Sequence, residues 1–179
     1  GDSRSTLGTG LSAATNYLAA MANSGTAGYF GGGHTTSDVT TVDKFAFSDD
    51  SRTTLGTGLS AATYQLAGMA NSGTAGYFGG GNGPVATVDK FAFSDDSRTT
   101  LGTGLSAARA DLAAMAASGT AGYFGGGNDG SSSVATVDKF AFSNDSRTTL
   151  GTGLSAATTH LAGAANSGTA AYIAGGYAA

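Results

Sequence analysis

Apolar and polar residues alternate in several short segments of the chain, and this pattern predicts β-strands. Residues 42–47 (Val-Asp-Lys-Phe-Ala-Phe) place Val, Lys and Ala on one face of an extended backbone and Asp and both Phe residues on the other. Residues 52–55 and 75–78 are expected to form further strands. Residues 48–51 (Ser-Asp-Asp-Ser) favour a turn, because such side chains hydrogen-bond their own backbone.

Residues 60–69 fit either a helix or a strand. Ala62, Leu66 and Met69 are at helical spacing, but so short a segment is marginal for a helix, and Gly68 lies inside it. A strand of small residues would suit a place where copies of a repeat converge. We therefore favour a strand and keep the helix as the alternative.

The same pattern occurs about four times. The sequence Ala-Gly-Tyr-Phe-Gly-Gly-Gly at residues 27–33 returns at 75–81 and 121–127, and in altered form at 171–176. The arginines of a second repeated block are 48, 46 and 49 residues apart, and they are Arg4, Arg52, Arg98 and Arg147. We interpret residues 1–179 as a single repeat domain. Its predicted units are residues 12–59, 60–105 and 106–154, with partial units at 1–11 and 155–179.

Each unit is predicted to hold four short antiparallel strands. That number of strands in about 47 residues is typical of a β-propeller blade. The predicted fold class is therefore all-β, a β-propeller of four-stranded antiparallel blades built from about four repeat units of 46–49 residues. Since one blade cannot bury its own faces, Phe45, Phe47, Leu59 and their counterparts are expected to pack against adjacent blades.

The predicted strands are not equally numerous. Counterparts of the strand at residues 42–47 occur three times, whereas those of the other three strands occur four times. We therefore expect that this chain does not close a ring by itself. Other copies of the chain, or flanking repeats, are expected to cover the open sheet edge.

Composition narrows the classes of function. The chain has 31 glycines and one proline, and all twelve acidic residues are aspartate, which favours turns over helices. A net charge of −4, with eight basic residues spread over the repeats, does not supply the basic surface that nucleic-acid binding requires. No apolar run is long enough to predict a membrane span. Low charge and abundant small residues suit an exposed appendage, so we expect an extracellular or virion-surface location.

The order of these features resembles the kelch repeat. Residues 77–80 (Tyr-Phe-Gly-Gly) are similar to the kelch double-glycine strand. Phe91, Arg98 and Arg109 stand where kelch repeats have Tyr, Trp and Arg, and the Arg109 place is taken in the other units by Thr15, Thr63 and Thr158. With its Val-Asp-Lys-Phe strands, the chain looks like the kelch-like arrays of bacterial surface proteins and phage tail fibres. This resemblance implies a structural or receptor-binding role instead of catalysis.

The units differ mainly in the loop that follows each glycine run. Insertions at one point of a repeat mark a surface loop, here repeated on one face of the assembly. The candidate binding residues in these loops are His34, Asp38, Asn82, Asn128 and Asp129.

No catalytic, metal-binding or cofactor-binding residue is predicted. His34 and His160 occupy non-equivalent places, whereas a metal or catalytic site normally needs a cluster of such side chains. The Asp49–Asp50 pair recurs in the next unit, which favours turn capping over acid–base catalysis, and calcium binding there would need six or more ligands. Residues 31–33 lack the lysine and helix that complete a phosphate-binding loop.

Several aromatic and charged residues recur at fixed positions and are interpreted as structural. Asp43 and Lys44 point to opposite faces of one strand, so each is expected to pair across blades, Asp43 with an arginine of the Arg52 class. The recurring residues are Tyr29, Tyr77, Tyr123 and Tyr172, with Arg4, Arg52, Arg98 and Arg147, and Asp43, Asp89 and Asp138.

The sequence therefore predicts a non-catalytic structural or assembly module of an extracellular or phage appendage. Its expected partners are other copies of itself or flanking repeats. The alternative is a receptor- or glycan-binding propeller that uses the variable loops together with Tyr17 and Tyr64. An enzyme is disfavoured, because the sequence offers no unique constellation of reactive residues.

Overall fold

The computed structural model describes residues 6–166 and 169–178, and over those residues the protein is all-β. Its strands form three four-stranded antiparallel sheets and one two-stranded hairpin. Sheet I contains β1 (Ala19–Asn23), β2 (Ala27–Gly31), β3 (Val42–Ala46) and β4 (Arg52–Thr54). Sheet II contains β5 (Ala67–Asn71), β6 (Ala75–Gly79), β7 (Val88–Ala92) and β8 (Arg98–Thr100). Sheet III contains β9 (Ala113–Ala117), β10 (Ala121–Gly125), β11 (Val137–Ala141) and β12 (Ser146–Thr149). The hairpin contains β13 (Thr159–Asn166) and β14 (Ala170–Tyr177).

Each four-stranded sheet is a meander in which strands adjacent in sequence pair with one another. The turns are short and use the predicted residues. At the β1–β2 turn Thr26 N donates to Asn23 O (2.9 Å), and at the β3–β4 turn Ser51 N donates to Asp49 Oδ1 (3.0 Å). Turn capping by Asp49 is thus confirmed. Within the described residues no helix is long and apolar enough to cross a membrane.

The strand predicted at residues 60–69 is confirmed only in part, and the helical alternative is wrong. Strand β5 begins at Ala67, and residues 60–66 form an irregular segment that leads into it. Ser60 N donates to Asp89 Oδ2 (2.7 Å), and Gln65 has a left-handed backbone with φ of 58°. Because of this hydrogen bond and the left-handed residue, residues 60–66 do not adopt the extended backbone of a strand.

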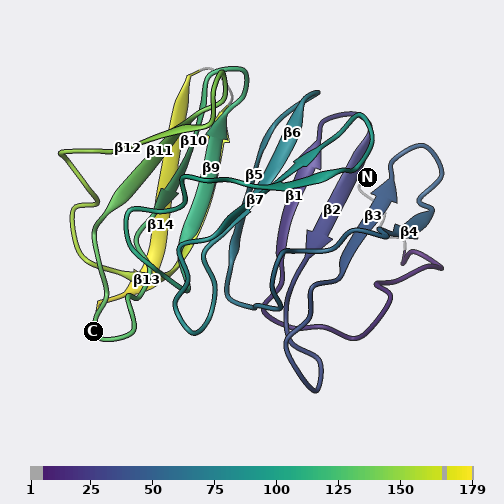
Figure 1. Ribbon diagram of the computed structural model, residues 1–179, viewed down its shortest axis with the longest axis horizontal. Helices are drawn as coiled ribbons and strands as arrows, with labels where there is room; N and C mark the ends of the chain where they lie inside the picture. The colour runs from purple at the N-terminus through teal and green to yellow at the C-terminus, as the bar shows by residue number, and fades with distance from the viewer. Residues whose placement is uncertain (1–5, 167–168, 179) are drawn as a thin grey trace, which may run out of the picture.

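Sheets I, II and III follow one another along the long axis of the molecule in chain order, and the hairpin overlaps sheet III in this view (Figure 1). The first strand of each unit lies beside the first strand of the next, from β1 to β5, β9 and β13. The sheets approach closely here, since a Cβ added to Gly68 would lie 2.5 Å from Ala20 O. The expectation that small residues mark the place where the copies converge is confirmed.

The core consists of two layers, each between successive sheets. In the first layer Met21, Tyr29 and Val42 of sheet I meet residues of the second unit, namely Leu59 and Leu66 before β5, Phe78 and Phe91 in sheet II, and Phe93 directly after β7. The second layer, between sheets II and III, repeats this arrangement with Met69, Tyr77, Val88, Leu105, Leu112, Phe124, Phe140 and Phe142. The predicted packing between units is confirmed for Leu59 and for the counterparts Phe91, Phe93, Leu105, Phe140 and Phe142. It is wrong for Phe47, which belongs to neither layer and is half exposed, and Phe45 also lies outside both layers.

Candidate functional site

A polar and aromatic contact recurs between successive sheets. Tyr29 of sheet I donates its hydroxyl to Asp96 Oδ1 of sheet II (2.8 Å), and Lys44 Nζ lies 2.7 Å from Asp96 Oδ2. The ring of Phe93 stacks on that of Tyr29 with centroids 5.2 Å apart. Asp96 is the second aspartate of its turn, and the predicted turn capping does not account for its side-chain contacts. This residue joins two sheets.

Sheets II and III repeat the contact with the same geometry. Tyr77 donates to Asp145 Oδ1 (2.8 Å), Lys90 Nζ lies 2.7 Å from Asp145 Oδ2, and Phe142 stacks on Tyr77 at 5.4 Å. We call this set of tyrosine, lysine, aspartate and phenylalanine the inter-sheet clasp. Its members are Tyr29, Lys44, Phe93 and Asp96 in the first layer and Tyr77, Lys90, Phe142 and Asp145 in the second.

The clasp holds its tyrosines neutral. Burial raises the pKa of Tyr77, and the hydrogen bond to the Asp145 carboxylate raises it further. Burial and Asp96 do the same to the pKa of Tyr29. Burial lowers the pKa of Lys44, but Asp96 and Tyr29 together outweigh it and leave that pKa raised.

These pKa shifts predict a loss of stability in alkaline solution. The folded pKa of Tyr77 lies above the unfolded value of about 10, so the folded state holds more protons between the two values and its advantage declines as the pH rises above about 10. Tyr77→Phe is expected to flatten this decline. Urea midpoints measured between about pH 8 and pH 11 test it, and a variant with an unchanged slope would contradict the assignment.

A second recurring site surrounds the buried aspartates Asp43, Asp89 and Asp138. Asp43 accepts from Ser12 N (2.7 Å) and Oγ (2.8 Å) and from Thr54 Oγ1 (2.6 Å). Burial alone would raise the pKa of Asp43, but these hydrogen bonds bring it below its ordinary value. Arg52 approaches it at 4.0 Å from the adjacent strand of the same sheet. The expected arginine partner is therefore right, whereas pairing across sheets is wrong for this aspartate.

The other copies agree with this assignment. Arg98 lies 3.4 Å from Asp89 and Arg147 lies 3.6 Å from Asp138, each within one sheet. Arg4 lies outside the described residues.

Arg109 adds a buried ion pair that the other units lack. Its guanidinium is 0 % exposed, contacts the carboxylate of Asp138, and donates through Nη1 to Gly126 O (3.0 Å) and Thr136 O (2.8 Å). Burial lowers the pKa of Arg109, while the charge of Asp138 opposes that shift. In the sequence, Arg109 was notable only because it stands where kelch repeats have an arginine.

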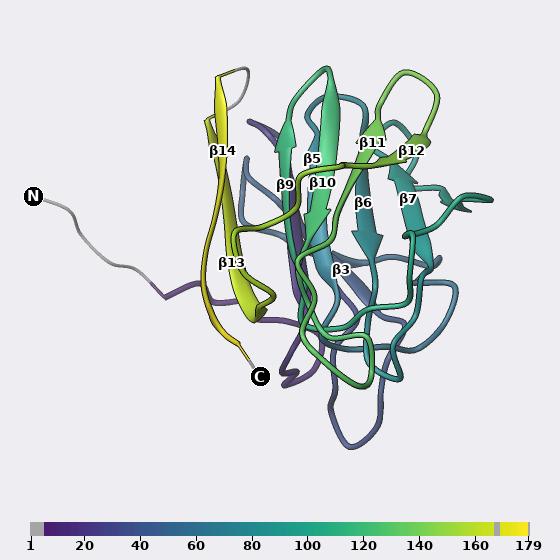
Figure 2. The same ribbon diagram turned by 90° about the vertical axis from the view of Figure 1, so that its left-hand side faces the viewer.

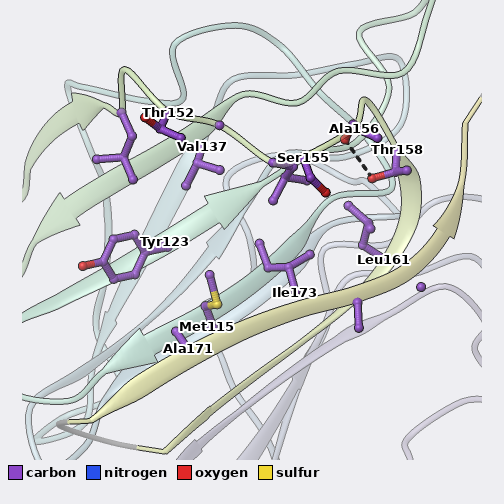
Figure 3. A pocket seen from close by; sticks show the side chains of 15 residues that line it. Met115, Tyr123, Val137, Thr152, Ser155, Ala156, Thr158, Leu161, Ala171 and Ile173 are labelled. Carbon is purple, nitrogen blue, oxygen red and sulfur yellow. Dashed lines mark hydrogen bonds between the residues drawn. The ribbon is translucent and has the colours of Figure 1, made fainter.

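A cavity of about 510 Å³ lies between sheet III and the hairpin (Figure 3), and we call it the end cavity. Its apolar lining repeats the two core layers position by position, through Met115, Tyr123, Val137, Leu150, Leu154, Leu161 and Ile173. Phe91 and Phe93 of the first layer have no counterpart among the described residues here. Tyr123 and Lys139 correspondingly have no clasp aspartate in the part of the chain that the structure describes.

The two ends of the stack expose opposite halves of the clasp. At the start, Phe30, Phe45 and Phe47 line a groove of about 430 Å³ together with Asp50, and Phe47 is 50 % exposed. We call these four residues the N-terminal end face. At the other end Tyr172, the counterpart of Tyr29, is 64 % exposed on β14.

The variable loops place some of the candidate binding residues together. His34 Nδ1 lies 2.8 Å from Asp38 Oδ1, and the His34 ring is 5.6 Å from Tyr64. Asn82 N donates to Tyr64 O (2.8 Å), so these loop residues surround one tyrosine. Asn128 and Asp129 belong to the next loop, where their side chains bind Gly130 N and the amides of Ser131 and Ser132.

A row of four equivalent residues crosses this loop face, and the sequence analysis named only Tyr17 among them as a candidate for binding. Tyr17, Gln65, Asp111 and His160 occupy one repeat position, and their φ angles lie between 53° and 58°. Backbone hydrogen bonds of 2.9–3.0 Å join each to the next. Left-handed geometry is costly for such residues, and it often accompanies function. The available signal was that the residue type at this position, and at the one before it, differs in every unit, whereas the flanking Ser-Ala-Ala and Leu are constant.

No protein-family model matches the sequence, and no curated protein shows significant similarity to it. Within residues 6–166 and 169–178 no three side chains of histidine, aspartate or glutamate gather in an arrangement that could hold a metal ion. The geometry of the inter-sheet clasp and of the two end faces is therefore the basis for inferring a function.

Proposed function

We propose that this protein is a non-catalytic structural and assembly module, of the type found in extracellular or phage appendages. Its units would be kelch-like propeller blades that associate end to end. The observation that carries the proposal is that one end exposes the phenylalanine and aspartate of the clasp and the other exposes its tyrosine. Phe47 and Asp50 match Phe93 and Asp96, and Tyr172 matches Tyr29.

The partner that fits these ends is a second copy of the chain. Phe47 of one copy would stack on Tyr172 of another, and Asp50 would accept the tyrosine hydroxyl, as in the two internal layers. The exposed apolar groove beside Phe47 supplies area for burial. Such a head-to-tail contact uses different surfaces on the two partners, so it gives rings or filaments.

The propeller arrangement is supported by the order of the strands within each sheet and by the close approach of the first strands. Each sheet is a four-stranded meander, and β1, β5, β9 and β13 lie side by side. Successive four-stranded sheets arranged in this way are the building principle of a propeller. Further units in a partner would continue the series.

Cross-linking tests this contact, because the chain contains no cysteine. We expect Ser48→Cys and Ala170→Cys variants, which leave Asp50 and Tyr172 in place, to be joined by a short bismaleimide when they are mixed. Each variant alone serves as the control, since a head-to-tail contact does not bring two identical ends together. Cross-linking that is no greater in the mixture than in the separate variants would contradict the proposal.

A receptor- or glycan-binding role is the second candidate, and one observation favours it. Tyr17 and Tyr64 lie 5.9 Å apart on the loop face, and His34 lies beside Tyr64. Tyr17 is 60 % exposed, and exposed aromatic rings provide flat apolar surfaces for ligands. Binding on a glycan array that Tyr17→Ala abolishes would support this role, and absence of any binding would exclude the glycans tested.

A further inference from the structure

The free edge of β14 and the end cavity adjoin one another. Strands β2, β6 and β10 each pair on both sides, whereas β14 pairs with β13 and with no other described strand. Figure 2 shows the hairpin beside β9, with β10, β11 and β12 of sheet III on the other side of β9. An unpaired strand edge is a template for an added strand.

We propose that the end cavity binds a β-hairpin of the repeat's own Val-Asp-Lys-Phe type. This inference rests on the proposed assembly function and identifies one segment that such an assembly would exchange. The incoming strand would run antiparallel to β14, as β3 runs to β2. Its lysine would then stand opposite Tyr172, as Lys44 stands opposite Tyr29.

Polar partners for two aspartates of this hairpin, those equivalent to Asp43 and Asp50, are already present in the protein. Ser155 lines the end cavity, and its counterparts Ser12, Ser60 and Ser106 all donate to a buried aspartate. For the aspartate in the turn of the hairpin, the partners are Tyr123 and Lys139, the clasp residues of sheet III that have no aspartate partner among the described residues. The Asp43-type and Asp50-type residues of the hairpin therefore each meet the group that binds them in the internal layers.

The apolar side chains of the hairpin would also have neighbours like those of their counterparts in the two internal layers. In the first layer Phe91 packs edge-on against Phe78 at 5.9 Å, and Phe93 stacks on Tyr29. In the end cavity Ile173 takes the place of Phe78 and Tyr123 that of Tyr29, and both lie beside the cavity in Figure 3. Two phenylalanines of the incoming strand would fill the space between them.

One residue difference between the units is expected to make the hairpin bind the end cavity more weakly than the equivalent strands pack inside the molecule. The internal units have glycine where β14 has Ala171, and a Cβ added to Gly76 would lie 3.1 Å from the Phe93 ring. At Gly122 the distance to Phe142 would be 3.0 Å. Ala171 therefore crowds the incoming phenylalanine, which suits a reversible contact. Ala171→Gly is expected to tighten binding.

The test uses the whole chain and a synthetic peptide of its residues 41–55 (Thr-Val-Asp-Lys-Phe-Ala-Phe-Ser-Asp-Asp-Ser-Arg-Thr-Thr-Leu). Calorimetry is expected to show saturable binding of one peptide per chain. Replacing the peptide's Asp50 by alanine is expected to weaken binding about tenfold, because a charge-assisted hydrogen bond is lost. Ala171→Gly in the protein is expected to tighten it about threefold.

Hydrogen exchange locates the bound peptide. The amides of β14 are expected to become protected when the peptide binds, since they gain strand partners. Absence of saturable binding, equal binding of the peptide without its Asp50, or protection confined to other strands would each overturn the proposal. Peptide binding needs only one copy of the chain, so it can succeed even if end-to-end cross-linking fails. Cross-linking can likewise succeed if the peptide does not bind. The two experiments therefore test the two proposals separately.

Discussion

Replacing Asp138 by alanine is expected to lower the free energy of unfolding by about 3–5 kcal/mol. The change leaves the Arg109 guanidinium, which is fully buried, without its counter-charge. It also removes the acceptor for Ser106 and Thr149. Urea unfolding of the purified variant, analysed by linear extrapolation, measures this loss.

The chain provides a matched control at the same position of sheet I. Asp43→Ala removes the equivalent serine and threonine bonds, but Thr15 stands where Arg109 would be, so a smaller loss of about 1–3 kcal/mol is expected. Adding Arg109→Thr to Asp138→Ala should restore most of the difference, because no buried charge then remains. Equal losses at Asp43 and Asp138 would show that the buried charge is unimportant.

Phe93→Ala is expected to cost about 3–5 kcal/mol, in contrast to less than about 1 kcal/mol for Phe47→Ala. The two residues occupy the same place in successive units. Phe93 is 9 % exposed and stacks on Tyr29, whereas Phe47 is half exposed on the N-terminal end face. The difference measures the contribution of a neighbouring sheet. Dilute protein, in which copies of the chain do not associate, is required for this urea measurement.

Phe142→Ala provides an independent repeat of the same comparison, because Phe142 stacks on Tyr77 with nearly the same geometry. It should behave as Phe93 does. If all three substitutions cost the same, the stacking of Phe93 and Phe142 across the layers would not stabilise the fold.

The sequence predicted the strands because their signals are local. The alternation in residues 42–47 gives β3, and Ser and Asp residues give the turn that follows it. The boundary of β5 was missed, because hydrogen bonds from distant residues decide it: Ser60 contacts Asp89, and the left-handed Gln65 binds Tyr17 O.

The clasp could not be predicted from spacing alone. Tyr29 and Asp96 are separated by 67 positions, and Asp96 looked like an ordinary turn residue next to Asp95. The end cavity was partly foreseeable, since the missing third strand was visible in the strand count. Its matching polar partners could not be predicted, because Ser155 and Tyr123 are far apart in the sequence and only the fold brings them to one cavity.

Association of the chain through its ends is the central claim, and light scattering tests it most directly. Over about a hundredfold range of concentration, the measured mass is predicted to rise above the 17.2 kDa of one chain. Phe47→Asp, which places a charge on the N-terminal end face, is predicted to return the mass to that of one chain without unfolding it. A mass of 17.2 kDa for the unaltered chain at every concentration would contradict the account.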